Sequence, residues 1–176
     1  MAIAEELLSH PTFDVEAYQD QCNSTLFGIA VINGHVDLLK LLIARDDVDK
    51  VPVDSLGYTP LMNAVACNKP ELFDLLLTIP ETWTDQWHLD ENNHNMLYVA
   101  VDAGHVEIVK RILNPALGVT KEMVREVGAA LDSDWDMVCE SEDLNQAQGE
   151  GYDETYGCYR LMRDYCARIE ATDLDS

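Results

Sequence analysis

The sequence predicts an all-α protein, built as a solenoid of stacked helix pairs with one further helix near its C-terminal end. Two observations predict this fold. A pattern of 34 to 36 residues recurs along the chain, and each copy holds two short apolar stretches with helical spacing that a Gly or Asn separates. One such unit cannot bury its own apolar face, so neighbouring units are expected to stack and bury it together.

The repeat is clearest where each unit begins. Three segments align, and their starts lie 34 and 36 residues apart: 25–35, 59–69 and 95–105. Each segment runs into a second apolar stretch with charged residues on its remaining face: 36–43, 70–77 and 106–113. We therefore expect a short helix, a tight break and a second helix in every unit.

The residues before each unit also recur. An Asp stands five residues before each start, at Asp20, Asp54 and Asp90. An Asn or Gly stands two residues before it, at Asn23, Gly57 and Asn93. Gly and Asn tolerate positive φ best, so this position predicts a tight turn ahead of each helix pair.

These segments resemble the ankyrin-repeat family. Residues 54–61 (DSLGYTPL) match the family's hairpin and helix-opening motif, and residues 33–42 (NGHVDLLKLL) match its inter-helix turn and second helix. The match covers about residues 12 to 113. The resemblance implies an ankyrin-repeat solenoid of about three full repeats with partial or degenerate terminal repeats.

The chain divides by this pattern into four parts. We expect an N-terminal half-repeat cap, three ankyrin repeats, a degenerate terminal repeat, and an acidic linker with a C-terminal helix: residues 1–19, 20–113, 114–144 and 145–176. The last helix is predicted from apolar residues at helical spacing between Tyr156 and Ile169. It lies outside the family pattern.

Composition limits the partners. The chain has 176 residues, of which 33 are acidic and 11 basic, giving a net charge of −22. Such a charge repels nucleic acid and anionic membranes, so the expected partner is another protein with a neutral or basic binding surface. We expect no nucleic acid or membrane partner, and a monomer.

The cysteines and the N-terminal residues indicate a compartment. The five cysteines lack the paired short spacing of a zinc site or a disulfide framework, which favours a reducing environment. The first residues, MAIAEELLSHP, do not form a signal peptide. The protein is expected in the cytoplasm, with the nucleus or delivery into a host cytosol left open.

Function follows from the resemblance. It implies a protein-protein interaction module, an adaptor or scaffold, that binds through hairpin tips and the concave face of the first helices. The alternative is a stoichiometric inhibitor of an enzyme, or a bacterial effector acting on host proteins. We expect no enzymatic activity, no catalytic residue, no metal and no cofactor, because no His stands by local motif beside a nucleophilic Cys or Ser.

The family's binding positions map onto particular residues of this sequence. The first repeat contributes Gln21, Cys22, Ser24 and Asn33. The second contributes Ser55, Leu56, Tyr58 and Cys67. The third contributes Glu91, Asn92, His94 and Asp102. Trp83 and Trp87, in the longer segment between Thr78 and Asp90, either anchor a partner or pack on a neighbouring helix.

One stretch superficially resembles a calcium loop. Between Asp132 and Asp143, oxygen-bearing side chains stand at relative positions 1, 3, 5, 9 and 12. Met137, however, occupies the position at which such a loop needs Gly. A degenerate terminal repeat explains these residues better, so no metal site is predicted.

Overall fold

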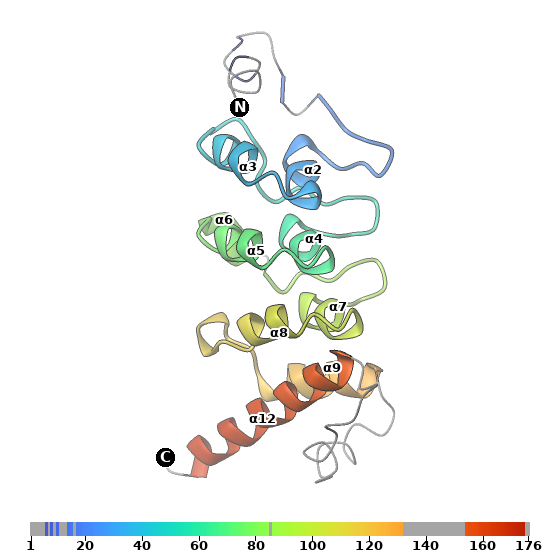
Figure 1. Ribbon diagram of the computed structural model, residues 1–176, viewed down its shortest axis with the longest axis vertical. Helices are drawn as coiled ribbons and strands as arrows, with labels where there is room; N and C mark the ends of the chain where they lie inside the picture. The colour runs from blue at the N-terminus through green and yellow to red at the C-terminus, as the bar shows by residue number, and fades with distance from the viewer. Residues whose placement is uncertain are drawn as a thin grey trace. The chain divides into compact units, whose positions relative to one another are not determined.

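The computed structural model describes residues 6, 8, 10, 14, 15, 17–84, 86–131 and 154–174, and its regular structure in these ranges is helical (Figure 1). The chain forms two compact units, residues 1–96 and 97–176. Among the described helices, none is long and apolar enough to cross a membrane.

In its described residues, the first unit contains two helix pairs and one further short helix. These helices are α2 (Leu26–Asn33), α3 (Val36–Ile43), α4 (Pro60–Ala66), α5 (Pro70–Leu76) and α6 (Pro80–Thr84). Helix α2 packs against its partner α3 and against α4, which in turn packs against α5. Successive pairs therefore lie parallel, with α2 and α4 in one layer and α3 and α5 in the other (Figure 1).

Side-chain caps fix where the inner helices α2 and α4 begin. The hydroxyl oxygen of Thr25 accepts a hydrogen bond from the Gly28 N–H at 3.4 Å, and that of Thr59 accepts one from Met62 at 3.3 Å. Each cap satisfies a backbone donor that the first turn of a helix leaves free. The recurring Thr is thus the start signal of the repeat.

A left-handed residue ends each inner helix. Gly34 has φ +77°, and the N–H groups of Gly34 and His35 donate to the carbonyls of Val31 and Ala30 at 3.0 and 2.8 Å. Asn68, with φ +50°, and Lys69 make the same pair of bonds at 3.0 and 2.9 Å. This closure reverses the chain, so that the outer helix starts two residues later.

Burial between the pairs stabilises helices that are too short to persist alone. Phe27 on α2, Leu39 and Leu42 on α3, and Met62 and Phe73 on the second pair are all at most 1% exposed. Each such side chain contributes about 1.5–3 kcal/mol by leaving water. The apolar residues that recur at helical spacing in the sequence form this interface.

The longer segment between Thr78 and Asp90 contains the short helix α6. Pro80 stands in its first turn, where the missing N–H costs nothing. The hydroxyl of Thr82 donates to the carbonyls of Leu76 and Ile79 at 2.7 and 2.8 Å. Thr82 and Ile79 are buried, which fixes α6 against the end of α5.

The second unit begins with another helix pair of the same kind. Helix α7 (Met96–Asp102) ends at Gly104, whose φ is +70°, and helix α8 (Val106–Ile112) follows. The N–H groups of Gly104 and His105 donate to Val101 and Ala100 at 3.0 and 2.9 Å. These are the same hydrogen bonds that close α2 and α4, so the third repeat has the geometry of the first two.

Two more helices follow among the described residues, and residues 132–153 between them are not described. After a 3-10 turn, η1 (Pro115–Leu117), and Gly118 with φ +66°, Thr120 immediately precedes helix α9 (Lys121–Leu131). The hydroxyl oxygen of Thr120 accepts from the Met123 N–H at 3.2 Å, as Thr25 and Thr59 do in their repeats. Helix α9 therefore occupies the position of an inner helix.

The C-terminal helix, α12 (Glu154–Leu174), packs on α8 and α9. Cys158, Met162 and Tyr165 lie on its buried face, and the Tyr165 hydroxyl donates to the Val119 carbonyl at 2.8 Å. A Cβ placed on Gly104 would come within 3.1 Å of the Glu154 Cβ, so the start of α12 lies directly against the α7–α8 turn. Helix α12 thus covers the second unit where another outer helix would stand.

Candidate functional site: a ridge of hairpin fingers

Three hairpins of one design precede the inner helices, and we call them finger 1 (residues 20–24), finger 2 (54–58) and finger 3 (90–94). In each, the first residue is the recurring Asp, and its N–H donates to the carbonyl four residues later at 3.0–3.1 Å. The fourth residue of each finger closes the turn, because its N–H donates to the carbonyl of the Asp. The fingers are therefore copies of a single backbone structure.

The Asp carboxylate holds each finger from inside. In finger 2, Asp54 Oδ1 accepts from the N–H groups of Leu56 and Tyr58 at 2.9 and 3.0 Å, and Oδ2 accepts from Asn63 Nδ2 at 3.0 Å. Asp20 and Asp90 accept the corresponding pairs of N–H bonds, all at 2.8 Å. A charged acceptor strengthens each bond, so one side chain fixes the turn.

Positive φ at the fourth finger position completes the design. Asn23, Gly57 and Asn93 have φ of +58°, +76° and +63°. Only Gly, Asn and Asp adopt this region readily, which explains the Asn or Gly in the repeat. At Gly57 a Cβ would also approach the Glu91 backbone nitrogen to 2.8 Å, so Gly is required there on contact grounds.

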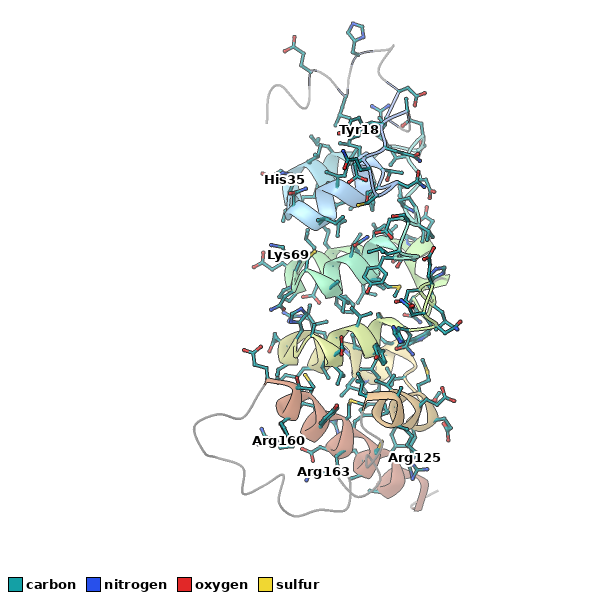
Figure 2. All side chains as sticks on the ribbon, turned by 90° about the vertical axis from the view of Figure 1, so that its right-hand side faces the viewer. Tyr18, His35, Lys69, Arg125, Arg160 and Arg163 are labelled. Carbon is teal, nitrogen blue, oxygen red and sulfur yellow. The ribbon has the colours of Figure 1, made fainter. Side chains whose placement is uncertain are left out.

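Backbone hydrogen bonds join each finger to the next. The N–H of Ser55 donates to the Cys22 carbonyl at 2.9 Å, and the N–H of Glu91 donates to the Leu56 carbonyl at 3.3 Å. Residues 20–24, 54–58 and 90–94 thus form one connected surface within the first unit, which we call the finger ridge. Figure 2 looks onto the side of the chain that carries the fingers.

The comparison with protein families identifies this architecture. A family model described as ankyrin repeats (3 copies) matches residues 2–84. Residues 2–84 of this chain are ankyrin repeats. The predicted fold class, an all-α ankyrin-repeat solenoid with a C-terminal helix, is confirmed. A comparison with curated proteins finds no match.

The ankyrin fingers present most of the predicted binding residues to solvent. Gln21, Cys22, Ser55, Leu56, Glu91 and Asn92 are all exposed finger positions. Tyr58 and His94, at the equivalent position of fingers 2 and 3, are half-buried. Ser24, their counterpart in finger 1, is only 3% exposed, because it lies against the start of α2. Ser24 therefore offers almost no surface for contact with a partner.

The predicted positions on the inner helices differ in access. Asn33 is exposed at the end of α2, where its amide donates to the Ile29 carbonyl at 2.9 Å. Cys67 is half-buried at the end of α4. Asp102 is exposed at the end of α7, in the second unit. Trp87 is half-buried, and Trp83 lies in α6 with its side chain outside the described structure.

Sequence reasoning missed three exposed apolar residues that lie beside the fingers. Val53 and Leu89 stand immediately before the Asp of fingers 2 and 3 and are 42% and 48% exposed. Tyr18, two residues before finger 1, is 56% exposed and lies on the side seen in Figure 2. A large apolar residue next to the recurring Asp, outside the helical apolar stripe, was the available signal.

The ankyrin fingers and the residues beside them carry acidic side chains but no Lys or Arg. The segments 17–25, 52–59 and 86–95 contain no Lys or Arg, yet each contains the hairpin Asp, and the last adds Glu91. His94 Nδ1 lies 3.5 Å from Asp90 Oδ2. The ridge therefore combines apolar side chains and carboxylates without a permanent positive charge.

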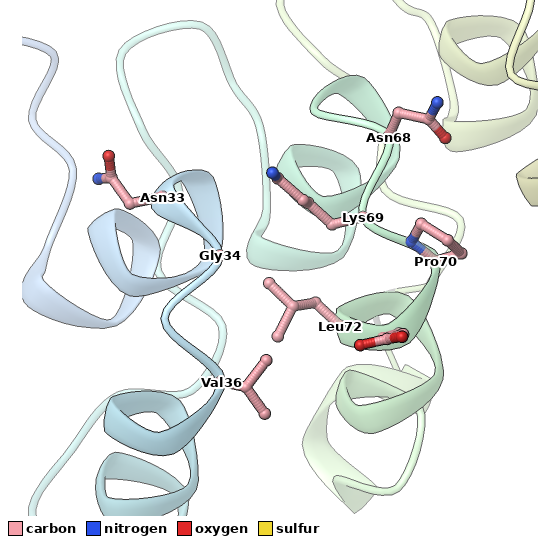
Figure 3. Close-up of a pocket in the computed structure, with 8 residues that line it drawn as sticks. Asn33, Gly34, Val36, Asn68, Lys69, Pro70 and Leu72 are labelled. Atoms are coloured by element: carbon pink, nitrogen blue, oxygen red, sulfur yellow. The ribbon is translucent and has the colours of Figure 1, made fainter. Parts of the chain in front are cut away.

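A small pocket lies at the other end of the inner helices, between the inter-helix turns of the first two repeats (Figure 3). It has a volume of about 260 Å³, below the usual range for a small-molecule site. Val36 and Leu72 face each other at its base, and Lys69 extends over Gly34, 3.6 Å from where a Cβ would stand. The aliphatic part of Lys69 packs beside the turn at Gly34 and lines the pocket, so we interpret the pocket as a gap between packed turns.

Metal ligation has little support in the described part of the chain. Among those residues, no three His, Cys, Asp or Glu side chains are grouped so as to hold an ion. The calcium-like run between Asp132 and Asp143 lies outside the described residues. Cys22, Cys67, Cys158 and Cys166 are free thiols.

Proposed function

We propose that this chain is an adaptor or scaffold that binds a partner protein through its finger ridge and the adjoining ends of the inner helices α2 and α4. Ankyrin repeats in general mediate protein-protein interaction. The observation that carries the proposal here is the ridge itself, a hydrogen-bonded surface with the apolar Leu56, 58% exposed, at its centre.

Preorganisation favours such a surface as a binding site. The Asp carboxylates, the left-handed residues and the bonds between fingers fix the backbone before any partner arrives. Binding to a fixed backbone loses little conformational entropy, so more of the contact energy is available as affinity. Buried apolar anchors at the centre of an interface usually carry most of that energy.

Charge defines the class of partner. The ridge carries carboxylates and no Lys or Arg, and the chain as a whole has a net charge of −22. A neutral or basic protein surface would be attracted, whereas nucleic acid and anionic lipid would be repelled. We propose a monomeric chain that meets its partner in the cytoplasm, and this role requires no catalytic residue or cofactor.

Site-specific photo-crosslinking tests the proposal. A photoreactive amino acid is placed at Leu56 on the ridge, and in a matched variant at Asp37, which is exposed on the outer helix α3. Illumination in cells is expected to give a discrete protein adduct from position 56 and none from position 37. Adducts from position 37 alone, or from neither position, would refute recognition by the ridge.

A further inference from the structure

The exposed residues Leu56 and Glu91 belong to neighbouring fingers of the ridge. The Glu91 N–H donates to the Leu56 carbonyl at 3.3 Å, and this bond joins finger 2 to finger 3. A Cβ placed on Gly57 would stand 2.8 Å from the Glu91 nitrogen, so the two hairpins also pack closely beside the bond. With standard covalent geometry, the bond keeps the Cα atoms of Leu56 and Glu91 within about 7 Å of each other. We call this pair of residues the Leu56–Glu91 junction.

The junction joins a residue with an apolar side chain to a residue with a carboxylate. Leu56 is 58% exposed, and Glu91 is exposed as well. The hydrogen bonds that hold the two hairpins use backbone groups and the carboxylates of Asp54 and Asp90, and not the side chains of Leu56 and Glu91. Both side chains are therefore accessible to a ligand without any change in the hairpins.

The chain supplies no cation for Glu91, although it does so for other exposed carboxylates. The carboxylate of Glu107 on α8 lies 3.5 Å from the Lys110 ammonium and 3.0 Å from the Arg111 guanidinium. No Lys or Arg occurs between Lys69 and Lys110 in the sequence, and Glu91 forms no ion pair in the described part of the chain. Its carboxylate is therefore open to a positive group of a partner.

One side chain matches both halves of the junction. Arginine has an apolar stem that covers exposed apolar surface, and a charged head that remains in contact with water. Its planar guanidinium donates two parallel hydrogen bonds to a single carboxylate, an arrangement that lysine does not offer. Arginine is also among the residues that most often carry the binding energy of protein interfaces. A purely aliphatic ligand would leave the carboxylate without a partner, and an acidic ligand would be repelled.

The equivalent pair between fingers 1 and 2 has the same backbone bond but different side chains. There the Ser55 N–H donates to the Cys22 carbonyl at 2.9 Å. Cys22 stands in the place of Leu56 and Ser55 in that of Glu91, so this pair has neither a large apolar side chain nor a carboxylate. It is an internal control for the backbone design, and recognition of arginine is not expected there.

We propose that the Leu56–Glu91 junction is a subsite for an arginine side chain of the partner protein. The stem of the arginine packs on Leu56, and its guanidinium pairs with the Glu91 carboxylate. The segments 52–59 and 86–95 contain no Lys or Arg that would repel it. This inference rests on the proposed function and names one side chain by which the ridge recognises its partner.

The probe for this subsite is a Gly-Arg-Gly tripeptide blocked at both ends, titrated into the full chain and followed by the amide NMR shifts of residues 56 and 91. The matched control peptide carries an arginine analogue with a single methylene in its stem, so its charge and its guanidinium are unchanged. The arginine peptide is expected to bind about fivefold more tightly than the control, because its longer stem buries more apolar surface on Leu56.

Variants locate the binding. Leu56→Ser removes the apolar half of the junction and Glu91→Gln removes its charge, and neither changes a backbone group that the hairpins use. Each is expected to weaken binding of the arginine peptide about fivefold. Asp37→Asn, which neutralises an exposed carboxylate on α3 and changes the net charge by the same amount, is expected to leave the affinity unchanged.

A transplant of the junction tests whether these two side chains are sufficient. In a chain that carries Leu56→Ser and Glu91→Gln, the further substitutions Cys22→Leu and Ser55→Glu recreate the pair between fingers 1 and 2. Binding of the arginine peptide is expected to return, with the NMR shifts now at residues 22 and 55.

The outcomes separate this inference from the proposed function. Equal affinity for the two peptides, equal loss of affinity in Glu91→Gln and Asp37→Asn, or a transplanted pair that binds no arginine would each overturn the subsite. Photo-crosslinking from position 56 measures capture of a protein independently of these peptides. If it gave an adduct after any of these failures, the ridge would remain a recognition surface that uses other side chains.

Discussion

At the residue scale, positive φ explains why an Asn or a Gly recurs two residues before the start of each repeat. Asn23, Gly57 and Asn93 could be predicted as turn residues, because Asn and Gly tolerate positive φ. That only Gly fits at the middle position could not be predicted, since the conflict is with the Glu91 nitrogen in the next repeat. A contact across repeats is absent from any local window of sequence.

The first prediction concerns this contact. Gly57→Ala adds both left-handed strain and a collision with the Glu91 backbone, and should lower the free energy of unfolding by more than about 2 kcal/mol. Gly118→Ala adds the same kind of strain with nothing within 4 Å, and should cost about 1 kcal/mol. Urea unfolding of both variants measures the difference, and equal costs would refute the contact.

A second residue-scale prediction concerns Tyr165. Burial raises the pKa of Tyr165 above its ordinary value, against the opposing effect of the Arg168 charge. Because the folded pKa is the higher one, the protonated phenol stabilises the fold below about pH 10, and this contribution is lost as the pH rises through the folded pKa.

Thermal unfolding at pH 8 and above pH 10 tests this sign. The native chain should lose stability between these values more steeply than Tyr165→Phe, which cannot ionise at that position. The variant should itself be about 1 kcal/mol less stable at pH 8, because it lacks the hydrogen bond to the Val119 carbonyl. Parallel pH dependences would show that Tyr165 does not ionise in a buried setting.

At the element scale, the helices were easier to predict than the fingers. The apolar stretch 36–43 coincides with α3, and the C-terminal helix predicted within 156–169 extends over Glu154–Leu174. Helical periodicity is a local signal, which explains this agreement. The short helix α6 was missed, because Pro80 and the buried Thr82 define it through contacts with α5 rather than through periodicity.

The Asp at the head of each finger is an example of a visible pattern whose role needs three dimensions. Its recurrence was evident, but the sequence could not show one carboxylate accepting bonds from two N–H groups of its own turn and, in Asp54, from Asn63. The same holds for Val53 and Leu89, whose exposure next to the fingers is known only from the structure.

Asp54→Ala should loosen finger 2 specifically. The substitution removes three hydrogen bonds to a charged acceptor and should lower the free energy of unfolding by about 2–4 kcal/mol. Amide hydrogen exchange in residues 55–58 should accelerate. Asp46→Ala, at an exposed loop position, serves as the control and should change neither quantity. Unchanged exchange in Asp54→Ala would mean that the carboxylate does not hold the turn.

At the scale of the whole molecule, the repeat period was sufficient to predict the fold class, since stacking is the way such units bury their apolar faces. The end of the second unit was less predictable. Helix α9 has the Thr cap and left-handed residue of a repeat, whereas α12 reaches it only after the residues 132–153. No spacing rule in the sequence places a helix from beyond such a segment against α8.

Met162→Ala tests whether α12 stabilises the second unit. Met162 is fully buried on the face of α12 that packs on α8 and α9, and its truncation should cost about 2–5 kcal/mol. Hydrogen exchange should accelerate in α8, α9 and α12. Arg160→Ala, at an exposed position of the same helix, should leave exchange unchanged. If the amides of α8 remained fully protected from exchange in Met162→Ala, the result would contradict stabilisation of the second unit by α12.

The central claim is that the finger ridge is the recognition surface, and hydrogen exchange of the chain bound to a captured partner tests it most directly. The account predicts slower exchange in residues 18–25, 52–58 and 86–94 on binding, with no change in the exposed residues of the outer helices α3 and α5. Protection confined to α3 and α5, with the fingers exchanging as in the free chain, would contradict it.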